Sequence, residues 1–229
     1  MLYLIPILVF ILLVTGPSIW VRWVMYRYRM DLPSIPGTGA ELVKHLATRF
    51  DIADLVVEET GNLQDHFDPS VPAIRLSPDN FNGRSLTAVA VAAHEIGHAI
   101  QWSRKETVFQ LRTRYVPLAK RLQRLGILLV SIAPILGIIT RHPIGAIGPI
   151  LGGVIAAIAG AATYLIVLPE EWDASFNKAL PMLLEGDYIS DQQEPAVRRI
   201  LKAAALTYAT SALFSVLAVW RWLPLLLRR

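Results

Sequence analysis

The 229-residue sequence contains no cysteine and few charged residues, which make up 17% of the chain. Without cysteine, a disulfide scaffold, a thiol-dependent enzyme and every thiolate metal site are excluded, so a transition metal would need histidine and carboxylate ligands. Soluble domains average about 25% charged residues. The low charge, together with 54% hydrophobic residues, therefore excludes a disordered polar chain and indicates a protein that lies partly in lipid.

Long uncharged segments predict about four membrane-spanning helices. A bilayer core about 30 Å thick takes roughly 20 residues of helix. The first segment is followed at once by Arg22, whereas a cleaved signal peptide has its basic residues before the apolar run. The second and third are separated by Arg141 and by the turn signal His142-Pro143, which predicts a helical hairpin. The four segments are residues 1–21, 125–140, 142–169 and 203–220.

The distribution of lysine and arginine favours the cytosol for the polar segments between these spans. Eighteen of the 22 basic residues fall in residues 22–124 and 170–202, and basic residues near spans face the cytoplasm. A hairpin enters and leaves the membrane on one face, so these two segments share a compartment in either orientation. The net charge of +4 is therefore interpreted as a topology signal, and no nucleic-acid partner is expected.

Residues 41–102 predict a small α+β arrangement. An amphipathic run covers residues 41–50, and residues 54–60 and 73–77 have the composition of short strands bounded by Pro, Asp and Gly. A long helix is expected from Asn82 to about Trp102. We expect residues 73–77 to form an edge strand that can bind an extended peptide, although a purely structural strand fits the sequence equally well.

The run His94-Glu95-Ile96-Gly97-His98 lies in the middle of this long helix. Residues four apart project from one helix face, so both imidazoles can bind one cation, and Glu95 can accept a proton from a water molecule there. This is the H-E-x-x-H arrangement of zinc hydrolases. Burying two histidines and an acid without such a role would be costly. The pattern predicts hydrolysis of peptide bonds, with Glu95 as the general base.

A catalytic zinc site needs a third protein ligand and one open position. The position six residues after His98, where one class of zinc protease has a third histidine, is Arg104. Because the predicted hairpin enters and leaves the membrane on one side, residues 169–175, which include Glu170 and Glu171, lie on the same side of the membrane as the motif helix. Residue spacing alone leaves the choice between these two glutamates open.

Several strings resemble the YugP-type membrane zinc metallopeptidases of bacteria, which are gluzincin-like. They cover nearly the whole chain and occupy residues 65–69, 75–77, 82–85, 92–101, 168–175 and 202–208. The resemblance implies a zincin-like catalytic domain with one Zn²⁺ per chain. The family pattern Pro-x-Glu-aromatic-Asp-Ala-Ser implies that Glu171 is the third ligand, and Trp172 stands where phenylalanine is usual.

Neighbouring residues are expected to orient the ligands and to stabilise an oxyanion. The wider membrane gluzincins have an aspartate in the place of Ser175, so Ser175 or Asp173 is expected to orient a metal ligand. An oxyanion donor is also needed. The candidates, each of which also has an ordinary structural interpretation, are Tyr208, Tyr188, His66 and Arg84.

We therefore expect a mainly α multi-pass protein of the cell membrane with a cytosolic α+β catalytic domain. The expected order is an N-terminal membrane helix (1–24), the catalytic domain (25–121), the membrane hairpin (122–168), a cytosolic segment with the third ligand (169–202) and a C-terminal membrane helix (203–229). Expected partners are a protein or peptide substrate, membrane proteins included, and the lipid bilayer. The alternative function is a non-proteolytic scaffold or chaperone-like protein with a retained metal site, but a structural zinc normally has four protein ligands.

Overall fold

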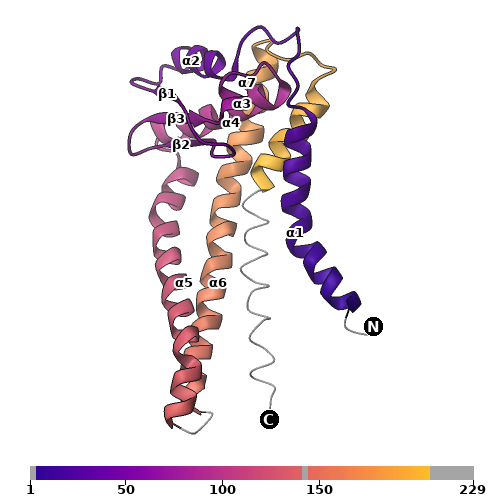
Figure 1. Cartoon of the computed structure of the whole chain (residues 1–229). Coiled ribbons are helices and arrows are strands. Elements are labelled where there is room, and N and C mark those ends of the chain that lie inside the picture. Colours follow the sequence, from indigo (N-terminus) through magenta and orange to yellow (C-terminus); the bar gives the residue numbers. More distant parts are fainter. Residues whose placement is uncertain (1–3, 141–143, 207–229) are drawn as a thin grey trace. The chain divides into compact units, whose positions relative to one another are not determined.

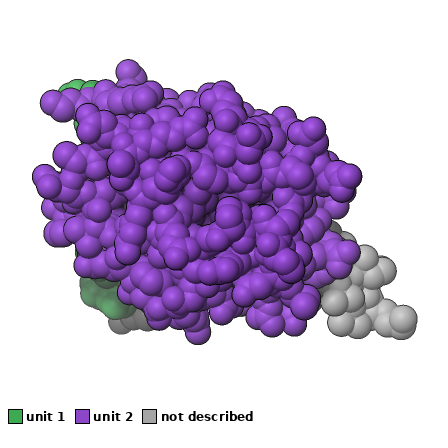
Figure 2. All heavy atoms as spheres, turned by 90° about the horizontal axis from the view of Figure 1, so that it is seen from above, with its two compact units in different colours: residues 1–14, 110–168, 208–229 green, residues 15–109, 169–207 purple. Residues whose placement is uncertain are grey.

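The computed structural model describes residues 4–140 and 144–206 and is mostly helical, with one small sheet (Figure 1). The chain divides into two compact units (Figure 2). One comprises residues 1–14, 110–168 and 208–229, and the other comprises residues 15–109 and 169–207. Each unit is therefore built from segments that are far apart in the sequence.

Two long helices, α5 (Thr107–Thr140) and α6 (Ile144–Trp172), dominate the first unit and lie side by side (Figure 1). Glycines in 144–160 predict such close packing. A Cβ atom on Gly152 would lie 2.6 Å from the Leu129 side chain, and one on Gly153 would collide with Val130. The prediction is confirmed at these two positions and is wrong at Gly148, where a Cβ would meet nothing within 4 Å. The predicted turn at 141–143 lies outside the described residues.

Among the described residues, one helical stretch is long and apolar enough to cross a membrane, Ile150–Glu185. It overlaps the predicted third span, 142–169. The first helix, α1 (Leu4–Arg27), covers the first predicted span. The fourth predicted span, 203–220, lies mostly outside the described residues, and the count of four spans stays a prediction.

Helix α4 (Leu86–Ser103) forms the centre of the second unit. The hydroxyl oxygen of Ser85 accepts a hydrogen bond from the Ala88 backbone N–H at 3.1 Å, which caps the first turn. Every residue from Leu86 to Gln101 is buried. A helix that is buried all round needs neighbours on every side. Here they include α2 (Gly39–Arg49), α3 (Pro78–Phe81), α7 (Leu180–Glu185) and the sheet.

The sheet has three strands, β1 (Val56–Glu59), β2 (His66–Asp68) and β3 (Ala73–Leu76), in the order β1-β3-β2. Strand β3 pairs in parallel with β1 and antiparallel with β2. The strands predicted at 54–60 and 73–77 are confirmed, whereas β2, at three residues too short for a periodic signal, is not predicted.

The expectation that residues 73–77 form an edge strand is wrong, because β3 is the middle strand of the sheet. The contacts of Arg75 reflect the position of β3 between two other strands. Its guanidinium donates to Glu58 on β1 at 2.8 Å and to Asp68 on β2 at 2.7 Å, so the carboxylates of both neighbouring strands neutralise it. The outer strands of the described sheet are β1 and β2.

A π-helix, η1 (Asp173–Ala179), continues α6 and leads into α7. In a π-helix the hydrogen bonds join residues five apart, and Lys178 accordingly forms an ion pair with Asp173. Gly97 lets η1 approach α4 closely. A Cβ on Gly97 would lie 2.7 Å from the Ala174 carbonyl oxygen and 3.2 Å from its Cβ. The segment after α6 is therefore pressed directly onto the turn of α4 that carries the histidines.

Candidate metal centre

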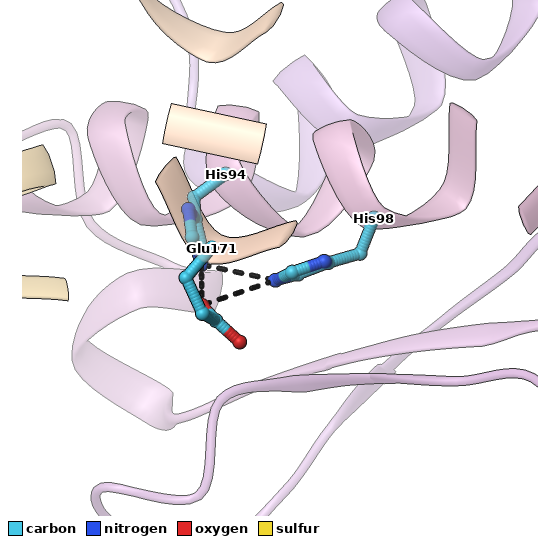
Figure 3. Close-up of side chains that lie close together, drawn as sticks. All are labelled: His94, His98 and Glu171. Atoms are coloured by element: carbon cyan, nitrogen blue, oxygen red, sulfur yellow. Dashed lines mark hydrogen bonds and ion pairs between the residues drawn. The ribbon is translucent and has the colours of Figure 1, made fainter. Parts of the chain in front are cut away.

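The side chains of His94 and His98, from α4, and Glu171, from the end of α6, converge on one point (Figure 3). The two imidazole Nε2 atoms are 3.1 Å apart. The Glu171 Oε2 atom lies 3.2 Å from the Nε2 of His94 and 3.4 Å from that of His98. Both histidines are 5% exposed and Glu171 is 1% exposed, so water does not separate the three groups from one another.

These spacings match the edges of a tetrahedron around a zinc ion. Zinc bonds to nitrogen and oxygen of roughly 2.0–2.1 Å give ligand atoms about 3.3 Å apart in a tetrahedral site. The three separations, 3.1–3.4 Å, scatter around that value. Two nitrogens and one carboxylate oxygen are also the donor set of many catalytic zinc sites. Among the described residues no fourth His, Asp or Glu joins the group.

Ser175 orients the His94 ring. Its hydroxyl donates to the Leu201 carbonyl oxygen at 3.3 Å and lies 3.0 Å from His94 Nδ1. Because the hydroxyl hydrogen is used by Leu201, the Ser175 oxygen accepts from Nδ1–H. The Nε2 atom of His94 then carries a lone pair directed at the centre of the site, as a metal ligand requires.

The two adjacent glutamates meet opposite nitrogens of the same imidazole. Glu171 lies at Nε2 of His98, whereas the fully buried Glu170 has its Oε1 atom 3.5 Å from Nδ1 of His98. Successive helix residues point about 100° apart, so only one of the pair can reach the point shared with His94. The structure brings Glu171 to that point.

The electrostatics of the site favour a positive charge at its centre. Burial by itself lowers the pKa of the His98 imidazole, but the carboxylates of Glu171 and Glu170 outweigh it and raise that pKa well above its ordinary value. Such an environment stabilises a cation, whether it is a proton or a metal ion.

Glu95 follows His94 directly and is 6% exposed. Burial raises the pKa of its carboxyl above the ordinary value; the two histidines oppose this shift, and the charges of Glu171 and Asp65 reinforce it. A carboxylate with a raised pKa is a better proton acceptor than an ordinary glutamate near neutral pH.

The structure brings some of the other predicted residues to the site and not others. Asp173 lies near it and accepts a hydrogen bond from Gln101 at 2.9 Å. His66 is exposed on β2 and donates to the Gln64 carbonyl oxygen at 2.6 Å, and the described contacts do not connect it with the three convergent groups. Tyr188 packs edge-on against His45 in the second unit, with ring centres 5.7 Å apart.

Of the last two oxyanion candidates, only Arg84 belongs to the described residues. Arg84 is exposed beside Asp31, whose carboxylate accepts from the Arg84 backbone N–H at 2.8 Å. Tyr208 lies outside the described residues.

Sequence reasoning missed Gln101, which has no exposed surface and lies with its Oε1 atom 3.0 Å from Nδ1 of His98. A signal was present, because a residue three positions after His98 falls on the same helix face. It also missed the π-helix, for which the sequence of residues 173–179 carries no recognisable pattern.

Comparison with known proteins agrees with this geometry. Residues 3–227 match the protein family described as "Putative neutral zinc metallopeptidase". The chain is 31% identical over 217 residues to the "Putative membrane protease YugP" of Bacillus subtilis (strain 168), an alignment that covers 93% of this chain and 92% of the relative. No solved structure matches the chain.

Proposed function

Because the chain belongs to the family of putative neutral zinc metallopeptidases, we propose that it is a membrane-embedded endopeptidase that uses one zinc ion per chain. His94, His98 and Glu171 would hold the ion. The observation that carries the proposal is the tetrahedral spacing of their three donor atoms, 3.1–3.4 Å, in a buried site. The hydrogen bond that fixes the His94 ring supports it further.

Peptide hydrolysis requires an electrophile, a base and a way to return the proton. When bound, zinc supplies a Lewis acid that polarises a carbonyl group and lowers the pKa of water to about 7. Glu95, adjacent to His94 and with its pKa raised by burial, accepts the proton from the attacking water. The same carboxyl then donates that proton to the leaving amine, so that Glu95 ends the cycle as it began.

The substrate would bind as an extended peptide along β2. This strand is an outer strand of the sheet, and it packs against α4 through the contact between Phe67 and Trp102, whose ring centres are 5.7 Å apart. Asp65, next to the start of β2, is close enough to influence the Glu95 carboxyl electrostatically. A peptide added to the outer edge of β2 by main-chain hydrogen bonds would therefore run past the proposed base.

We place the enzyme in the cell membrane with the catalytic groups facing the cytosol. The apolar helical stretch Ile150–Glu185 and the distribution of basic residues support this placement, as does the description of the Bacillus relative as a membrane protease.

The base is tested with Glu95→Gln in the full chain purified in detergent. Zinc content should stay at one ion per chain, because Glu95 is not among the ligands, while the rate of peptide cleavage falls by about 10²–10⁴-fold. Removing zinc with a chelator should abolish cleavage in the wild type, and adding zinc back should restore it. Cleavage by Glu95→Gln at the wild-type rate would refute the assignment of the base.

The adjacent glutamates provide a matched pair for the ligand. Glu171→Gln should lose zinc, because a neutral amide replaces the negatively charged ligand atom. Glu170→Gln is the comparison: it changes a buried neighbour on the other side of His98, so it should weaken zinc binding less than Glu171→Gln does. Loss of zinc from Glu170→Gln but not from Glu171→Gln would reverse the assignment.

A further inference from the structure

Gln101 is a buried glutamine whose whole amide group is engaged. Its Nε2 atom donates to the Glu170 backbone carbonyl at 2.9 Å and to the Asp173 carboxylate at 2.9 Å. Its Oε1 atom lies 3.0 Å from Nδ1 of His98. The contact with His98 stays within α4 and reaches a proposed metal ligand, and the other two cross from α4 to residues on either side of Glu171.

These partners determine which way the amide points. A backbone carbonyl accepts hydrogen bonds and cannot donate them. The same is true of a carboxylate that is paired with an ammonium group. Asp173 is such a carboxylate, because it forms an ion pair with Lys178. Turning the amide round would place its oxygen against two acceptors, so the nitrogen must face Glu170 and Asp173.

The orientation of the amide in turn determines the state of His98. With its nitrogen committed, Gln101 presents only its oxygen to Nδ1 of His98, at 3.0 Å against 3.5 Å for Oε1 of Glu170. Because both of these neighbours are acceptors, Nδ1 must carry a hydrogen. The Nε2 atom is then the one available to bind a metal ion.

Lys178 and Glu106 hold this arrangement in place. The Lys178 ammonium group donates to Glu106 at 2.8 Å and also contacts Asp173. The ammonium is thus shared by two carboxylates, one beside the end of α4 and one on the π-helix. The contact between Lys178 and Asp173 depends on the π-helical spacing, which brings residues five apart together.

We propose that Gln101 is a positioning residue that holds His98 with Nδ1 protonated and Nε2 presented to the metal, and that Asp173 and Lys178 fix its orientation. This inference rests on the proposed function and assigns a role to the glutamine that follows the H-E-x-x-H motif. Outer partners of metal-bound histidines typically change metal affinity by about 10–100-fold when they are removed.

Two substitutions separate positioning from packing. Gln101→Met fills the same space with no polar atom, whereas Gln101→Glu keeps an oxygen that accepts from Nδ1 of His98. Zinc affinity is measured by chelator competition in the full chain, and unfolding of the metal-free protein is followed in parallel. We expect Gln101→Met to bind zinc 10–100-fold more weakly than the wild type and Gln101→Glu to recover most of the affinity.

Asn177→Ala is the control, because Asn177 donates to the other oxygen of Asp173 at 2.9 Å and is exposed. It should bind zinc as the wild type does. A packing role predicts the opposite order of the two substitutions, and Gln101→Met binding zinc as tightly as Gln101→Glu would overturn the proposal.

A measurement that needs no variant covers the case in which Gln101→Met fails to fold. Ring ¹⁵N chemical shifts of the zinc-loaded wild type should show His98 with a protonated Nδ1 and a metal-bound Nε2, and the reverse assignment would overturn the proposal. A wild type that binds no zinc would overturn both proposals, whereas a failure of the Gln101 experiments with zinc bound would overturn this one alone.

Discussion

Replacing Gly97 by alanine should weaken zinc binding without removing a single polar group. The added Cβ would lie 2.7 Å from the Ala174 carbonyl oxygen, which is 0.7 Å short of the 3.4 Å at which ordinary contact begins. The obstacle is backbone, so η1 has to move. A movement of that size would lengthen the 3.0 Å contact between Ser175 and His94 to about 3.7 Å, beyond hydrogen-bonding distance.

Two free-energy changes accompany this movement. Overpacking a buried contact costs about 1–3 kcal/mol, while the higher helix propensity of alanine over glycine returns about 1 kcal/mol. The loss of global stability is therefore small. Zinc affinity, in contrast, should fall by about 10–100-fold, because the partner that orients His94 is displaced.

The assay is chelator competition for zinc, with denaturant unfolding of the metal-free protein measured alongside. Gly148→Ala is the matched control, since a Cβ there would meet nothing within 4 Å. It should leave zinc affinity unchanged and add up to about 1 kcal/mol of stability. Unchanged zinc affinity in Gly97→Ala would show that the close approach of η1 to α4 does not position the ligands.

Two further predictions concern Ser175 and the sheet. Ser175→Ala should bind zinc at least about tenfold more weakly, because Nδ1–H of His94 loses its acceptor; chelator competition measures this, and wild-type affinity would contradict it. On the sheet, hydrogen bonds from Ser70 and then from Arg75 hold the pKa of the Asp68 carboxyl well below its ordinary range. A depressed pKa stabilises the fold above the unfolded value of about 3.9. The stability advantage of wild type over Asp68→Asn should therefore be present at neutral pH and shrink as the pH falls below 4, and an advantage that grows toward acid would refute it.

The sequence predicted the elements that have strong local signals. The motif helix follows from a long run of apolar residues after Ser85, and β1 and β3 follow from short segments of strand-like composition bounded by turn residues. The convergence of the two histidines follows from helical spacing alone.

The remaining features depend on contacts between distant segments. Glu170 and Glu171 are equivalent by spacing, and they differ in which nitrogen of His98 each carboxylate meets in the folded chain. Strand β2 is identified only by its pairing with β3. The orientation of Gln101 depends on Asp173, 72 positions away, and no local pattern reports it.

The placement of the third proposed ligand at the end of α6 also sets an order for biosynthesis. The histidines and Glu95 come from α4, and Glu171 comes only after α5 and most of α6 have been made. A nascent chain that ends within α5 carries a base and two histidines but lacks the carboxylate and the η1 segment that orients His94. Two ligands hold zinc much more weakly than three. The proposed zinc site is therefore complete only late in synthesis, once the end of α6 and η1 have been made.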